Sequence, residues 1–205
     1  MSILSVFMVS FTIALSGALA PGPLLTTVIA QSIRHGAKSG PLIILGHAAL
    51  EAVMIGLIML GLTPLVSNPS IMRAISLAGA LVLFYFGVQL LWSIPRLSLE
   101  TTPPPASKKR LVLLGVTVSL SNPYWTIWWL TIGLGLVLAA SRQGWLAVAV
   151  FFFGHVVADL AWYSIISLGI SRGRKFISDK VYRASIAVCA AALIGFALYF
   201  ALTAL

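Results

Sequence analysis

Six apolar segments, each long enough to cross a lipid bilayer, constrain this 205-residue chain more than any other feature. They lie near residues 3–31, 39–62, 71–93, 111–139, 145–170 and 184–204. Only 8% of the residues are charged, whereas about a quarter are charged in soluble domains. Such a chain cannot cover a water-facing surface. The sequence therefore predicts an all-α integral membrane protein with six transmembrane helices.

Basic residues lie mainly in alternate loops between these segments. Eleven fall in the first, third and fifth loops: Arg34, Lys38, Arg96, Lys108, Lys109, Arg110, Arg172, Arg174, Lys175, Lys180 and Arg183. The other loops contain only Arg73 and Arg142. Because cytoplasmic loops of membrane proteins are enriched in lysine and arginine, we expect the basic loops in the cytoplasm and both termini outside. The same rule explains the net charge of +9 without a nucleic-acid partner.

Two proline motifs interrupt the apolar segments. Pro21-Gly22-Pro23 falls within the first segment, and Asn122-Pro123 falls within the fourth. A proline inside a helix costs about 3 kcal/mol, and a bilayer tolerates the freed backbone groups only beside protein or a wet cavity. We therefore expect broken or kinked first and fourth helices. The helix that starts after each break would direct its positive dipole end at a substrate carboxylate. The alternative is a simple kink without a ligand.

A cleaved signal peptide is a competing interpretation of the N-terminus, because Ala18-Leu19-Ala20 resembles a small-residue cleavage site. Two observations oppose it. The first ten residues carry no basic side chain, and cleavage would fall directly before Pro21. We therefore expect the first segment to be retained.

The two halves of the chain resemble each other. GHAALEAVMIGLIMLG at 46–61 aligns without gaps with GHVVADLAWYSIISLG at 154–169, and Pro23 has a counterpart in Pro123. Chance similarity explains shared leucines and alanines, but poorly explains a shared Gly-His pair followed by an acid. Because each half contains three segments, an odd number, the second copy crosses the membrane in the orientation opposite to that of the first. We predict one membrane domain, residues 1–205, built as a 3+3 inverted repeat: repeat 1 about 1–93, a linker at 94–110 and repeat 2 about 111–205.

Two acidic residues lie deep within their apolar segments. Glu51 and Asp159 are placed where an ionised acid costs roughly 2.5–3.5 kcal/mol on insertion scales. A purely structural hydrogen-bonded pair is one explanation. We favour a functional role, because burial disfavours the charged form and lets either acid exchange a proton near neutral pH.

A histidine precedes each of these acids by four residues. His47 shares a helix face with Glu51, and His155 shares one with Asp159. Three interpretations stay open: the histidines orient the acids, the pairs relay protons, or the four side chains bind a metal ion through imidazole and carboxylate ligands. Nothing in the sequence requires the two pairs to meet at one point.

Further residues after the breaks could line the same path. Thr27 and Gln31 follow the first break at a spacing of four, and Trp125 follows the second break. Aromatic residues of this kind also form core or interface belts. The predicted substrate-binding set is Pro21, Gly22, Pro23, Thr27, Gln31, Asn122, Pro123 and Trp125. The sequence predicts no cofactor.

The order of these motifs resembles the LysE/RhtB family of amino-acid exporters over nearly the whole chain. The similarity rests on Pro21-Gly22-Pro23, the turn Arg34-His35-Gly36, an acidic residue in the second span and Asn122-Pro123 at the fourth. It implies a multi-pass protein of a bacterial or archaeal plasma membrane that exports amino acids or their derivatives, driven by protons. Glu51 stands where members often carry an acid. The two histidines are not part of the family pattern.

The pattern and the resemblance together predict a secondary active exporter of a small amino acid, cationic or zwitterionic, and not an enzyme. Its partners would be the amino acid, protons and membrane lipid. Helix faces rich in small residues are compatible with a homodimer. A divalent metal-ion exporter using His47, Glu51, His155 and Asp159 is the alternative. A scaffold would not need acids inside the membrane, and a thiol-transferring relative would need a cysteine pair, whereas the chain has only Cys189.

Overall fold

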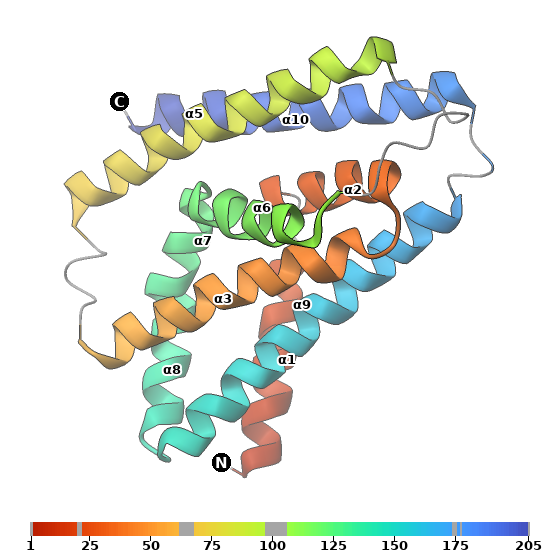
Figure 1. Cartoon of the computed structure of the whole chain (residues 1–205). Coiled ribbons are helices and arrows are strands. Elements are labelled where there is room, and N and C mark those ends of the chain that lie inside the picture. Colours follow the sequence, from red (N-terminus) through yellow and green to blue (C-terminus); the bar gives the residue numbers. More distant parts are fainter. Residues whose placement is uncertain are drawn as a thin grey trace.

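The computed structural model describes residues 2–19, 22–61, 68–96, 106–173, 176 and 178–204, and this part of the chain is helical with short connections (Figure 1). The elements are α1 (Ile3–Ala18), α2 (Pro23–His35), α3 (Ser39–Met59), α5 (Pro69–Ser93), η1 (Ile94–Arg96), α6 (Lys108–Leu120), α7 (Pro123–Trp128), the π-helical turn η2 (Trp129–Gly133), α8 (Leu134–Ser141), α9 (Trp145–Gly173) and α10 (Asp179–Ala204). The predicted linker at 94–110 already contains η1 and the first turn of α6, and its residues 97–105 lie outside the described part.

Five helical stretches are long and apolar enough to cross a membrane: α3, α5, the continuous run Pro123–Ser141, α9 and α10. A sixth span results if α1 and α2, whose axes differ by 75°, are counted as one broken helix. Large apolar side chains such as Leu81, Phe153 and Leu202 are exposed, as lipid-facing residues are. The predicted all-α membrane architecture is confirmed.

Both predicted helix breaks are present. Helix α1 ends at Ala18, and α2 begins at Pro23 after Gly22, whose backbone is extended; Pro21 lies outside the described residues. Helix α6 ends at Leu120, and the chain changes direction before α7 begins at Pro123 (Figure 1). Proline suits the first position of a helix, because the N–H that it lacks would have no helical partner there. The prolines therefore mark new helix starts rather than kinks within one helix.

Glycines allow two close helix crossings that place the two histidines. A Cβ on Gly46 of α3 would lie 1.9 Å from a backbone oxygen of α6, and one on Gly115 of α6 would lie 1.9 Å from a backbone oxygen of α3. Helix α9 approaches α1 in a similar way at Gly154, where a Cβ would lie 2.8 Å from a backbone oxygen. The residues that follow Gly46 and Gly154 are His47 and His155, so each histidine is fixed beside a tight crossing.

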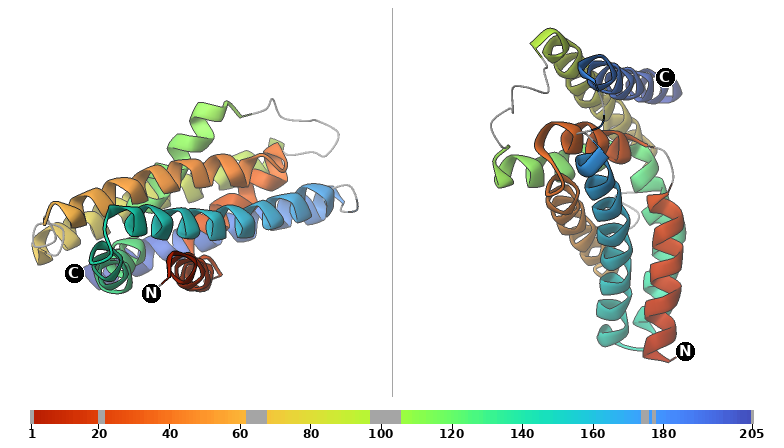
Figure 2. Two further views of the ribbon diagram at one scale, coloured as in Figure 1. Left: turned by 90° about the horizontal axis from the view of Figure 1, so that it is seen from below. Right: turned by 90° about the vertical axis from the view of Figure 1, so that its right-hand side faces the viewer.

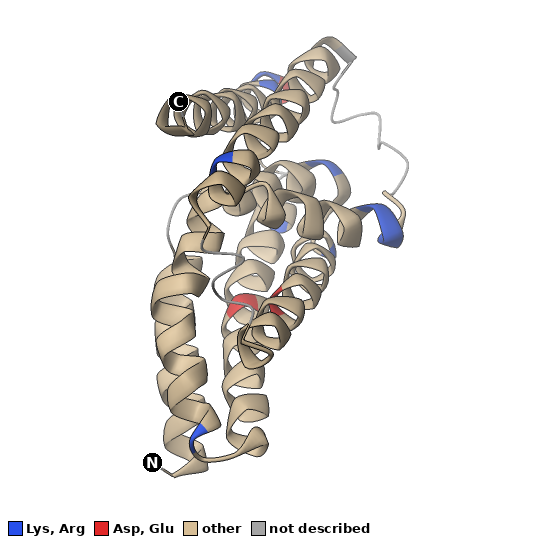
Figure 3. Ribbon diagram, turned by 90° about the vertical axis from the view of Figure 1, so that its left-hand side faces the viewer, with Lys and Arg blue, Asp and Glu red and all other residues tan. Residues whose placement is uncertain are grey.

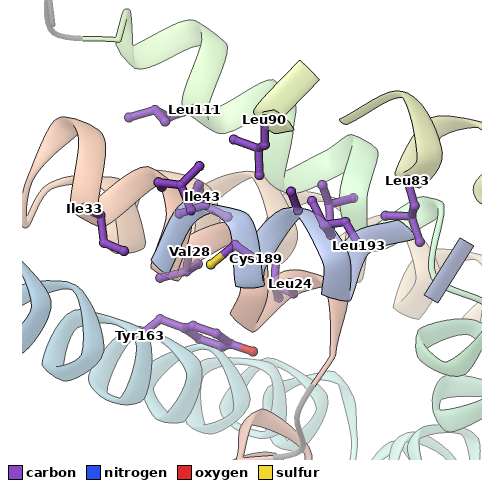
Figure 4. Packing of buried hydrophobic residues seen from close by; sticks show 14 of the residues in the cluster. Leu24, Val28, Ile33, Ile43, Leu83, Leu90, Leu111, Tyr163, Cys189 and Leu193 are labelled. Atoms are coloured by element: carbon purple, nitrogen blue, oxygen red, sulfur yellow. The ribbon is translucent and has the colours of Figure 1, made fainter. Parts of the chain in front are cut away.

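Helices α3 and α9 pack against each other in the middle of the molecule, with α1 along α9 and α6 along α3 (Figure 2). Helices α5 and α10 form an antiparallel pair that packs on α2 (Figures 1 and 2). An apolar cluster joins this pair to α2, α3 and α6 through residues such as Leu24, Ile43, Leu83 and Leu193 (Figure 4). The sulfur of Cys189 is buried in the same cluster, where it contributes packing.

Candidate functional site

Four ionisable side chains from the two halves of the chain meet between α3 and α9. The Nε2 atoms of His47 and His155 each lie 3.0 Å from Oε1 of Glu51 and 3.6 Å from Oδ2 of Asp159. All four residues are at least nine-tenths buried. Figure 3 shows the acidic positions of α3 and α9 side by side midway along the molecule, whereas Lys and Arg lie toward helix ends. We call these four residues the His-acid cluster.

Two neighbouring side chains hold members of the cluster in place. Ser119 of α6 lies with its Oγ 2.6 Å from Nδ1 of His47, which fixes the ring and leaves Nε2 facing the acids. Trp129 is fully buried, and its indole N–H donates to Oε1 of Glu51 over 3.3 Å. It is the first residue of the π-helical turn η2, a distortion that often occurs at functional sites.

The two acids have different surroundings. Oε1 of Glu51 faces three nitrogen atoms at 3.0 to 3.3 Å: Nε2 of His47, Nε2 of His155 and the indole nitrogen of Trp129. Oδ2 of Asp159 and Oε2 of Glu51 are buried without a hydrogen-bond partner. A buried carboxylate oxygen without a donor is costly, so both oxygens are available to a cation or a donor that enters the site.

A cavity of about 390 Å³ adjoins the His-acid cluster. Its wall is formed by the two helix breaks, by aromatic residues after the second break and by the C-terminal part of α10. The lining residues are Ala14, Gly17, Ala18, Gly22, Pro23, Leu24, Leu25, His47, Glu51, Asn122, Tyr124, Trp125, Trp128, Trp129, His155, Asp159, Tyr163, Phe196, Tyr199 and Phe200. Small-molecule sites typically measure about 300–1,000 Å³, so the cavity is large enough for a small metabolite.

Aromatic rings lie close to both histidines. The ring of His155 lies 5.2 Å from that of Trp128, 5.3 Å from that of Trp129 and 6.2 Å from that of Phe151, measured between centroids. Trp125 stands edge-on to His47 at 6.5 Å. Such rings cover part of the cluster with apolar surface, which strengthens electrostatic interactions within it.

Four residues of the predicted substrate-binding set line this cavity; Pro123, Thr27 and Gln31 do not, and Pro21 lies outside the described residues. Gly22, Pro23, Asn122 and Trp125 are in its wall, and Pro123 begins α7 directly beside it. Thr27 and Gln31 line a second cavity of about 530 Å³, together with Arg34, Lys109 and Arg110. The described residues of that second wall include no acid.

Sequence reasoning did not identify Ser119 or assign a contact to Trp129. The signal for Ser119 was available, since it stands one turn before the break at Asn122-Pro123. Trp129 follows Trp125 by four residues, a spacing that places both on one helix face but indicates no contact. In the structure the side chain of Trp129 reaches Glu51, whereas the indole nitrogen of Trp125 is buried without a partner.

A family model described as LysE type translocator matches residues 15–204. The chain belongs to the LysE type translocator family. It is similar to a Bacillus subtilis protein named "Putative amino acid efflux protein YcgF", with 22% identity over 200 residues that cover 96% of this chain and 95% of that protein. It is also similar to "Chemotactic transduction protein ChpE" of Pseudomonas aeruginosa, with 26% identity over 200 residues that cover 95% and 96% of the two chains. No protein of solved structure matches.

The predicted family is thus confirmed, and the chain is a multi-pass membrane translocator. Membership of the LysE type translocators agrees with a transport role rather than an enzymatic one.

Proposed function

We propose that this LysE type translocator exports a small cationic or zwitterionic amino acid across a bacterial or archaeal plasma membrane in exchange for protons. One observation carries the proposal: a single cavity of about 390 Å³ contains both a helix start suited to a carboxylate and a pair of buried acids suited to an ammonium group. The similarity to a protein named for amino acid efflux supports the same class of substrate.

The carboxylate of the amino acid would bind at the start of α2. Thr26 is the first residue of this helix whose N–H bonds to the preceding turn, at 3.0 Å from the oxygen of Gly22. The N–H groups of Leu24 and Leu25 precede it and have no partner within the helix, and both residues line the cavity. A helix N-terminus attracts an anion through these groups and through its dipole.

The ammonium group or a proton would bind at the His-acid cluster. The described wall of the cavity contains no Lys or Arg, so the two acids favour a cation over an anion. If substrate and protons exclude each other at Glu51 and Asp159, inward proton flow drives outward substrate flow. One proton that crosses 100 mV supplies roughly 2.3 kcal/mol, which corresponds to an almost fiftyfold concentration gradient.

The helix pairing supports the proposed inverted repeat. A symmetry that exchanges the two halves would convert the α1–α9 contact into the α6–α3 contact, and both contacts are present. It would also pair α3 with its counterpart α9, and α5 with its counterpart α10, as observed. Transporters with such repeats bind substrate near the bilayer midplane at the repeat interface, which is where the His-acid cluster lies in this proposal.

Transport by the purified protein in proteoliposomes tests the proposal. We expect uptake of a radiolabelled amino acid, driven by a pH gradient, in the wild type and in the control Asp179→Asn, which removes an acid at the start of α10 outside the cavity. Glu51→Gln and Asp159→Asn should each lower pH-driven transport at least tenfold. Full proton-coupled activity in both variants would exclude the acids from coupling, and absence of transport for every amino acid would reject the substrate class.

A further inference from the structure

Three members of the His-acid cluster are spaced closely enough to bind one metal ion. One ligand atom each from His47, Glu51 and Asp159 lie within 4.8 Å of one another. His155 faces the same two carboxylate oxygens at the same two distances as His47, 3.0 and 3.6 Å. Zinc ligands lie about 2.0–2.2 Å from the ion, so neighbouring ligand atoms of a tetrahedral site are about 3.4 Å apart. The observed imidazole–carboxylate distances fall on either side of this value.

The charges are also compatible with a divalent ion. Two carboxylates are buried together, and the described wall of the cavity supplies no Lys or Arg to balance them. A single divalent cation balances both acids while both imidazoles stay neutral. Neutral imidazole and ionised carboxylate are the forms in which these side chains bind metals.

One of the two possible directions of the hydrogen bond between His47 and Ser119 suits a metal ion. When its Nδ1–H donates to Ser119, the lone pair of Nε2 faces Oε1 of Glu51 and Oδ2 of Asp159. A lone pair and two carboxylate oxygens repel each other unless a cation stands between them. A second-sphere bond of this kind from the far nitrogen is usual for metal-binding histidines, and Oδ2 of Asp159 is buried without any donor of its own.

We propose that His47, Glu51, Asp159 and His155 bind one divalent first-row transition-metal ion between the two halves of the protein. Two imidazole nitrogens exclude Mg²⁺ and Ca²⁺, which prefer oxygen ligands. The absence of cysteine from the site, with two nitrogen and two oxygen ligands, fits ions from Mn²⁺ to Zn²⁺. The inference concerns binding of the ion and does not depend on an amino acid being the transported molecule.

Metal binding is measurable on the purified full-length protein in detergent after treatment with a chelator. Zn²⁺ binding is followed by calorimetry, and Co²⁺ binding by its visible absorption, which reports nitrogen and oxygen ligands. We expect one ion per chain, no saturable binding of Mg²⁺, and at least tenfold weaker binding in His47→Ala and His155→Ala. The control is His35→Ala, which removes the remaining histidine, at the end of α2, and should bind as the wild type does.

Asp159→Asn and Ser119→Ala keep the inference testable if a histidine variant does not fold. Asp159→Asn removes a ligand charge with almost no change of shape, and it should weaken binding as strongly as a histidine variant. Ser119→Ala leaves all four ligands but releases the ring of His47, so it should weaken binding about tenfold. Absence of saturable Zn²⁺ and Co²⁺ binding in the wild type would overturn the inference. Unchanged affinity in a folded His47→Ala, His155→Ala double variant would overturn it as well.

Discussion

His155 Nε2 lies 3.0 Å from Oε1 of Glu51, although the two residues are 104 positions apart in the chain. The contact joins the second half of the protein to the first at a buried point. The same oxygen of Glu51 also contacts Nε2 of His47 and the indole nitrogen of Trp129. In contrast, Oδ2 of Asp159 has no hydrogen-bond partner. The two acids of the repeated motif are therefore not equivalent: Glu51 organises the site, and Asp159 offers an open acceptor.

This asymmetry predicts different effects on stability. Glu51→Gln removes the charge that accepts the indole N–H of Trp129, a bond worth about 1.5–3 kcal/mol when its acceptor is charged, and that faces both imidazoles at 3.0 Å. We expect a clear drop in the thermal unfolding temperature of the protein in detergent. Asp159→Asn removes a like charge beside Glu51 and should leave that temperature within a few degrees of the wild type, or raise it. Equal losses in the two variants would show that the acids play the same structural role.

The indole N–H of Trp129 gives a second prediction. Trp129→Phe keeps an aromatic ring next to His155 but deletes the donor to Glu51. We expect a loss of about 1–3 kcal/mol in stability and weaker binding of any cation at the cluster. Trp125→Phe is the matched control, since its indole nitrogen is buried without a partner in the structure. Thermal unfolding of both variants, with and without ligand, measures the difference, and a larger effect from Trp125→Phe would contradict it.

The crossing of α3 and α6 gives a third prediction. Gly46→Ala would place a Cβ 1.9 Å from a backbone oxygen, so the helices must move apart. We expect a loss of stability of about 1–3 kcal/mol. Because His47 is the next residue, we also expect its side chain to shift away from Glu51 and Asp159. Gly56→Ala on the same helix is the control: nothing lies within 4 Å of its Cβ, and alanine is the better helix former. The two variants are compared by purification yield and unfolding temperature. A Gly46→Ala variant as stable as Gly56→Ala would refute the close crossing of α3 and α6.

Local chemistry made much of this architecture predictable. Pro23 and Pro123 fix helix starts because proline lacks an N–H, and Glu51 and Asp159 stand out because acids inside apolar segments are costly. The spacing of four residues also placed each histidine on the same helix face as its acid. These inferences concern one helix at a time.

The sequence could not show that the two histidine–acid pairs meet at one carboxylate oxygen, because this contact depends on how α3 and α9 cross. The contact of Trp129 depends on the π-helical turn η2, which changes the helical register. Thr27 and Gln31 share a helix face with Pro23, but Gln31 is eight residues along α2, about 12 Å at 1.5 Å per residue. The face therefore continues from one cavity into the other.

The orientation of the chain gives a fourth prediction. Basic residues lie near the ends of α2 and α9 and near the starts of α6 and α10, whereas Arg142 follows the end of α8. The ends of α2 and α9 and the start of α10 lie on the right of Figure 1, and α8 ends on the left. The positive-inside rule then places Lys38 in the cytoplasm and Gln143 outside. Both side chains are exposed, so single cysteines at these positions can report the topology.

In a Cys189→Ala background, we expect Gln143→Cys to react with a membrane-impermeant maleimide in intact cells. Lys38→Cys should react only after the cells are permeabilised, because its loop would face the cytoplasm. The Cys189→Ala parent, labelled under both conditions, gives the background signal. The reverse pattern would invert the topology. The second cavity, which Arg34 and Lys109 line, would then lie on the outer side of the membrane.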